Sequence, residues 1–131
     1  MTFAEKLAAF AELAVKIGVN VQPGQYLLIN TTTDTLEFTR EVVKKAYEAG
    51  AGRVHVNLTD AVFERAFFEN TTVEELEKFP KWIVAQREEL IERNGALLWI
   101  DAADPDLLAG IDVEKIDRKS TRLNSSHQAS S

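Results

Sequence analysis

The chain has 131 residues, of which 45% are hydrophobic, and it contains no cysteine. This length and composition suit one modest domain with one core, and they exclude a disulfide framework, thiolate chemistry and a cysteine metal site. The net charge of the whole chain is −6, and residues 1–116, with 12 basic and 20 acidic side chains, are more negative than that. This charge disfavours binding to nucleic-acid phosphates.

The first expected element is an amphipathic helix that begins at Thr2 and ends at Gly18. Thr2 and Glu5 have the spacing of a capping box, in which each satisfies a free backbone N–H of the other. Its apolar face is predicted to contain Phe3, Leu7, Phe10, Ala14 and Ile17. A membrane-surface helix would carry more Lys and Arg on its polar face, so we expect this helix to pack on a core.

The stretch from residue 25 to residue 59 predicts a strand, a helix and a second strand. The apolar run 25–30 follows the turn dipeptide Pro23-Gly24, and residues 34–49 have helical spacing with a capping box at Asp34 and Glu37. Glycines at 50 and 52 stop the helix, and residues 53–59 form the next strand. Two strands joined by a helix of this length are expected to lie parallel.

Three further helices and a third strand are expected after residue 59. The helices span 60–69, 72–79 and 81–93, with Asp60 and Thr72 as the expected caps of the first two. The apolar strand spans 96–101. A helical pattern then begins at Leu107 and runs to Ile116. The predicted fold is three-layer α/β, with a mainly parallel sheet of at least three strands and helices on both faces.

His55 is the only histidine before residue 117. It alternates with Val54 and Val56, so it is expected on the opposite face of its strand. Without cysteine or a second histidine four residues away, it cannot form a zinc site by itself. We interpret it as a structural polar group, and a role as ligand or base is the less favoured alternative.

Acidic residues follow two of the strands, at the edge where open parallel sheets bind ligands. Asp34 follows the first strand, and Asp101, Asp104 and Asp106 follow the third. Phosphate binding at the helix start near Asp34, or a divalent metal held by the later group, are the functional alternatives. Helix capping and turn formation are the favoured interpretations.

The sequence contains no recognisable catalytic constellation. Gly50-Ala51-Gly52 precedes a strand, whereas a dinucleotide fingerprint needs its glycines between a strand and a helix. A nucleophile elbow, a zinc-protease helix motif and a phosphate loop are also missing. We therefore assign no catalytic, cofactor-binding or metal-ligating residue to the chain.

An ordered set of short segments resembles the beginning of a known family. These segments are 21–29, 46–51, 54–56 followed by Asp60, Trp82 with Arg87, 95–96, and 104–112. Together they resemble the start of the metalloaminopeptidases typified by aminopeptidases T and S, over essentially residues 3–116.

That resemblance implies a homodimeric, two-domain enzyme that releases N-terminal amino acids from peptides with two divalent metal ions, zinc, cobalt or magnesium. In such enzymes the metal ligands and the catalytic acid/base belong to the C-terminal domain, which this chain lacks. The chain is then expected to be a truncated N-terminal domain, inactive alone, that walls the substrate cleft. Apolar surface is expected to be exposed where the missing domain would dock.

The last residues form a separate segment. Residues 117–127 resemble the in-frame translation of a sequencing adapter, so we interpret 117–131 as an artefactual disordered tail and 1–116 as the domain. A basic tail that binds an acidic surface is a minor alternative.

Two other functions remain open at this point, together with the location of the protein. The chain could be a self-contained doubly wound domain that binds a nucleotide or phosphate. It could also be a non-catalytic interaction module that uses the apolar faces around Phe63, Phe67, Phe68 and Trp82. No apolar run reaches the roughly 18 residues of a membrane span, and Glu5 and Glu12 interrupt a signal-peptide pattern, so we expect a cytoplasmic protein.

Overall fold

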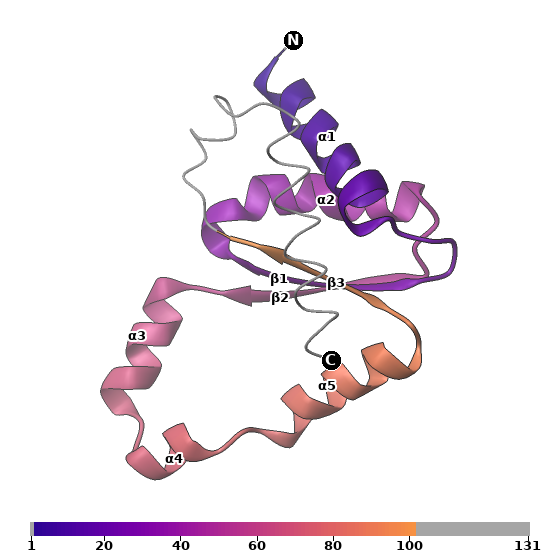
Figure 1. Cartoon of the computed structure of the whole chain (residues 1–131). Coiled ribbons are helices and arrows are strands. Elements are labelled where there is room, and N and C mark those ends of the chain that lie inside the picture. The colour runs from indigo at the N-terminus through magenta and orange to yellow at the C-terminus, as the bar shows by residue number, and fades with distance from the viewer. Residues whose placement is uncertain (1, 102–131) are drawn as a thin grey trace.

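The computed structural model describes residues 2–101, and its centre is a sheet of three parallel strands (Figure 1). The strands are β1 (Tyr26–Thr32), β2 (Arg53–Thr59) and β3 (Ala96–Ile100), in the order β2–β1–β3. In this register Leu28 of β1 lies opposite both His55 and Leu97. The parallel pairing that the sequence predicts for the first two strands is therefore confirmed, and the first strand of the chain is the central one.

One face of the sheet carries the hydrophobic core. Helices α1 (Phe3–Leu13) and α2 (Leu36–Glu48) lie together over this face (Figure 1). The largest fully buried side chains come from the strands and from both helical segments above them: Leu27, Ile29, Leu98, Val15 and Val42. Each stabilises the fold by about 1.5–3 kcal/mol relative to an exposed position. This layer holds the sheet in place and so fixes the positions of its edges.

The N-terminal helix changes its winding halfway along. Thr2 accepts a hydrogen bond from the Glu5 N–H at 3.1 Å, as the capping pattern predicts. After Leu13 the chain continues as a π-helix, η1 (Ala14–Val19), whose wider turns shift the buried face. Ile17 is consequently 54% exposed, so its predicted place in the core is wrong, and Val15 is buried instead.

The start of α2 also differs from the prediction. A 3₁₀ turn, η2 (Thr33–Thr35), precedes the helix, and Thr35 occupies the N-cap position without a side-chain capping bond. Asp34 lies inside that turn and is exposed, so the capping role predicted for it is wrong. At the other end Gly50 has φ of 100° and ends the helix as predicted.

Three helices lie on the other side of the sheet. They are α3 (Ala61–Asn70), α4 (Val73–Glu77) and α5 (Lys81–Glu92), and none of them contains a buried residue. Figure 1 shows α5 below the sheet, while α3 and α4 lead away from it. The predicted helices on both faces are confirmed, but only the α1–α2 side is closely packed. Within residues 2–101, no helix has the length and apolar character needed to cross a membrane.

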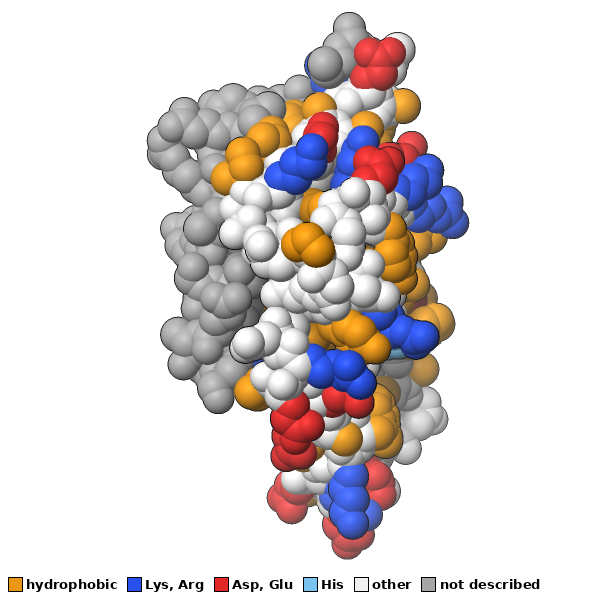
Figure 2. Space-filling model, turned by 90° about the vertical axis from the view of Figure 1, so that its right-hand side faces the viewer, with side chains coloured by type: hydrophobic (Ala, Val, Ile, Leu, Met, Phe, Trp, Pro, Cys, Tyr) orange, Lys and Arg blue, Asp and Glu red, His pale blue; other side chains and the backbone are white. Residues whose placement is uncertain are grey.

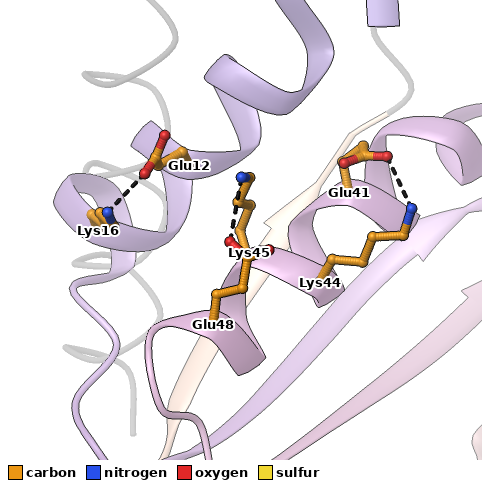
Figure 3. Close-up of polar contacts among 6 residues, drawn as sticks. All are labelled: Glu12, Lys16, Glu41, Lys44, Lys45 and Glu48. Carbon is orange, nitrogen blue, oxygen red and sulfur yellow. Dashed lines mark hydrogen bonds and ion pairs between the residues drawn. The ribbon is translucent and has the colours of Figure 1, made fainter. Parts of the chain in front are cut away.

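Ion pairs lie on the outer surface of the helical layer formed by α1, η1 and α2 (Figure 3). Glu12 pairs with Lys16 at 2.7 Å across the junction of α1 and η1. The hydrogen bond from Lys16 and its charge hold the pKa of Glu12 below its ordinary value. Lys44 and Lys45 pair with Glu41 and Glu48 of α2, each at 3.3 Å. Such exposed pairs are screened by water and contribute little, so the core and not the surface charge holds these helices.

Candidate functional site

Threonine hydroxyls gather at the carboxyl edge of the sheet, where β1 and β3 end. The hydroxyls of Thr31 and Thr35 contact each other, and each lies 3.0 Å from a backbone carbonyl, of Ile100 and Thr32 respectively. Thr39 of α2 extends this chain of hydroxyls at 3.2 Å from Thr35. All three side chains are buried, so the cluster ties the start of α2 to the ends of two strands.

Asp60 closes the same edge next to β2. Its Oδ2 accepts a hydrogen bond from the Thr33 hydroxyl at 2.6 Å, and its Oδ1 accepts one from the Val62 N–H at 2.8 Å. These bonds favour the ionised form, and the bond from Thr33 is the main reason why the pKa of Asp60 lies below its ordinary value. The predicted helix-capping role of Asp60 is confirmed, and the carboxylate also fastens the β1–α2 loop to the start of α3.

The aspartates that the sequence places at this edge do not form a group in the described part of the chain. Asp34 and Asp101 are both exposed. Asp104 and Asp106 lie outside the described residues. The structure therefore does not test whether the aspartates at 101–106 bind a metal or form a turn. Among the described residues, the acidic side chain that accepts hydrogen bonds at this edge is Asp60.

A ladder of amide side chains crosses the second face of the sheet. Asn57 Nδ2 donates to Asn30 Oδ1 at 3.0 Å and to Gln86 Oε1 at 2.8 Å, and Gln86 Nε2 donates back to Asn57 Oδ1 at 3.3 Å. The ladder joins β1 and β2 to α5. The sequence pattern does not predict this ladder, although two asparagines inside strands, where asparagine is uncommon, are a signal for it.

A small cavity lies between this face and α5, on the amino side of the ladder. It has a volume of about 210 Å³, and its lining includes Arg53, His55, Gln86 and Glu89. His55 faces it, away from the core that Val54 and Val56 contact, as the alternation predicts. The cavity thus combines a cation, an imidazole and a carboxylate at a partly open surface.

The residues present do not fit a divalent metal centre. In residues 2–101 no group of three or more His, Cys, Asp or Glu side chains is positioned to hold a metal ion. His55 has Arg53 as a neighbour in its cavity, and both oxygens of Asp60 already accept hydrogen bonds. We therefore derive no metal-dependent chemistry from the described residues.

The most unusual surface of the molecule is apolar and belongs to α3, α4 and the start of α5. Phe63, Phe68 and Trp82 are 67%, 65% and 72% exposed. A tryptophan in this sequence is expected either in the core or at a domain interface, and the exposure of Trp82 excludes the core of the described residues. Figure 2 shows hydrophobic side chains between charged ones over the lower part of the molecule. Large apolar side chains exposed on successive helices typically mark an interaction site.

Comparison with known proteins identifies aminopeptidases as relatives. The chain is 43% identical over 115 residues to aminopeptidase AmpS of Bacillus subtilis and 38% identical over 112 residues to aminopeptidase 2 of Geobacillus stearothermophilus. These matches cover 88% and 86% of this chain but only 28% and 27% of the relatives. The chain therefore spans little more than a quarter of the length of these relatives.

A solved structure and a family model agree with these matches. Wild-type AmpT from Thermus thermophilus superposes with a TM-score of 0.70 at 25% identity, over 92% of this chain and 32% of that one. The model of the family described as thermophilic metalloprotease (M29) matches residues 3–130. The chain belongs to the M29 metallopeptidase family.

Proposed function

We propose that this chain is the N-terminal part of a metal-dependent aminopeptidase that removes N-terminal residues from peptides. The observation that carries the proposal is the family match over residues 3–130, together with relatives that are named aminopeptidases. The same comparisons do not favour a self-contained nucleotide-binding domain or a non-catalytic interaction module. In this proposal the catalytic metal-binding domain belongs to the rest of the protein.

The described residues would then form one wall of the substrate cleft. The carboxyl edge of the sheet, fastened by the Thr33–Asp60 bond and the buried threonines, is the rigid part of that wall. Peptide substrates carry backbone N–H groups, and the exposed carboxylates of Asp34 and Asp101 at this edge would supply acceptors for them. The wall would bind and orient the peptide and exclude water, while two-metal chemistry would polarise the scissile carbonyl and activate a water elsewhere in the protein.

Several finer features are part of the same proposal. The intact enzyme would use two divalent metal ions chosen from zinc, cobalt and magnesium, act as a homodimer and work in the cytoplasm. The family and the relatives' names support a metallopeptidase acting on peptides. The N-terminal domain would comprise residues 1–116, followed by an artefactual tail at 117–131.

The test is to recover the coding sequence beyond codon 116 and assay the full-length product on leucyl substrates with added cobalt, zinc or magnesium. We expect metal-stimulated release of the N-terminal residue by the full-length enzyme, and no such activity from the 131-residue chain. A folded full-length product without metal-stimulated activity would refute the proposal, as would unaided cleavage by the 131-residue chain.

A further inference from the structure

The segment 61–79, here called the docking arm, comprises α3, α4 and the residues up to Phe79. Its large apolar side chains are exposed along the whole length, among them Val62, Phe63, Phe67, Phe68, Val73 and Phe79. Complete burial of each of these side chains would stabilise the protein by about 1.5–3 kcal/mol. An arm of this composition is therefore suited to an apolar partner.

The docking arm is nevertheless a defined structure and not a loose loop. Asp60 caps α3, and Thr72 caps α4 by accepting a hydrogen bond from the Glu75 N–H at 3.2 Å. The rings of Phe67 and Phe68 make an edge-on contact at 5.6 Å between centroids. The Thr33–Asp60 bond fixes the arm at one end, and the Asn57–Gln86 amide pair fixes the chain beyond its other end. The sheet thus presents the arm in a fixed place.

The path of the chain indicates what covers the docking arm. Because the strands are parallel, β2 and β3 end at the same edge, on either side of β1 and about 10 Å apart. The arm leaves this edge after β2, and the polypeptide that follows residue 101 leaves it after β3. Full-length AmpS is matched over only 28% of its length, so a complete member of the family has ample further chain to reach the arm.

The charges of the docking arm indicate what kind of surface would fit it. Its two cations are engaged within the arm, Arg65 with Glu69 at 2.7 Å and Lys78 with Glu75 at 2.9 Å. Glu64, Glu74 and Glu77 have no ion pair among the described residues. The surface that fits the arm is consequently apolar at its centre and basic at its rim.

We propose that the docking arm is an interdomain clamp, covered in the intact protein by the part of the same polypeptide that follows residue 101. The inference rests on the proposed function only in taking the chain as part of a longer M29 protein. It assigns the interdomain contact to α3 and α4, and it leaves the carboxyl edge of the sheet open to the cleft.

The test compares the 131-residue chain with a full-length chain in which residues 1–116 are joined to the remaining part of AmpS. Hydrogen exchange followed by mass spectrometry should show amides of 61–79 slowed by at least about tenfold in the full-length chain, because burial suppresses local opening. Phe68→Glu should abolish this protection, whereas the control Ile17→Glu, at an exposed apolar position on η1, should leave it unchanged.

A photo-crosslinking amino acid in place of Phe68 identifies the occupant directly. Mixtures of isotopically heavy and light chains should give crosslinks within one polypeptide, to a segment beyond residue 101. Crosslinks of mixed mass would assign the arm to a second copy and overturn the proposal, as would unchanged exchange in the full-length chain.

The same comparison can be made in a natural full-length protein. If the chimaera does not fold, hydrogen exchange in full-length AmpS, over the segment that aligns with 61–79, gives the same comparison, and rapid exchange there overturns the inference. None of these measurements depends on catalysis. A protected arm in an inactive full-length protein would therefore refute the proposed function and leave the interdomain clamp standing.

Discussion

Gly52 lies against the backbone of Gly24, so closely that a Cβ atom on Gly52 would stand 2.5 Å from the Gly24 carbonyl oxygen. The two turns at this point are also hydrogen-bonded, from the Gly24 N–H to Gly50 O at 2.7 Å and from the Gly52 N–H to Gln25 O at 2.8 Å. These contacts hold the turn before β1 against the turn after α2. The register of β1 and β2 therefore depends on the close approach of these two backbone segments.

Replacing Gly52 by alanine should destabilise the chain by about 1–3 kcal/mol, because backbone and not a flexible side chain would have to move. Urea unfolding measures the change. Gly24→Asn is the matched control, since a Cβ there meets nothing within 4 Å and asparagine tolerates the φ of 78°. Equal losses in the two variants would show that close approach is not the reason for glycine at 52.

Truncating a core side chain should destabilise the 131-residue chain much more than truncating a side chain of the docking arm. Ile29→Ala removes a fully buried side chain of the central strand, and it should lower the free energy of unfolding by about 2–5 kcal/mol. Phe63→Ala on the arm should change it by less than about 0.5 kcal/mol. A large loss from Phe63→Ala in denaturant unfolding would mean that the arm is already covered in this chain.

The amide ladder should hold α5 on the sheet. Asn57→Ala and Gln86→Ala each remove hydrogen bonds between β2 and the helix, and a double-mutant cycle should give a coupling energy of about 0.5–1.5 kcal/mol. Faster amide exchange in α5 should accompany both variants. Additive effects of the two substitutions would contradict a direct interaction.

The hydrogen bond between Thr33 and Asp60 should make the stability of the chain fall at acidic pH. Asp60 has a folded-state pKa below its ordinary value of 3.8, so its contribution to stability is present above that value and is lost as the pH falls through the folded pKa. In Thr33→Val the pKa of Asp60 should rise towards 3.8, measured by carboxyl NMR titration. Asp60→Asn keeps a good N-cap and should reduce the acid-induced loss of stability.

Sequence patterns predicted the parts of the fold that depend on near neighbours. The second strand was expected at 53–59 and lies at Arg53–Thr59, and the caps at Thr2, Asp60 and Thr72 all form. These features need only a short hydrogen bond or an alternation of side chains, which a few residues specify. The family resemblance likewise rested on local segments, and the match over residues 3–130 confirms it.

The structural features that the sequence did not predict are those in which alternative contacts compete. Nothing in the periodicity distinguishes an α-turn from the π-turn after Leu13, although the difference moves Ile17 to the surface. Asp34 has the spacing of a cap, but the 3₁₀ turn places Thr35 at the helix start. The amide ladder joins Asn57 to Gln86, 29 residues apart, and only the folded sheet brings them together.

The strand order has a consequence for how the protein is made. The central strand pairs with β3 across a separation of 69 residues, as Leu27 does with Ala96, whereas it pairs with β2 across 27. A ribosome releasing roughly 5–20 residues per second therefore leaves one edge of β1 unpaired for about 2–8 seconds after Thr59 has emerged. The phenylalanine-rich helix α3 emerges in that same interval. Nascent chains of this protein should accordingly be clients of ribosome-bound chaperones, which shield the open edge of β1 until β3 pairs with it and shield the aromatic side chains of α3 beyond that point.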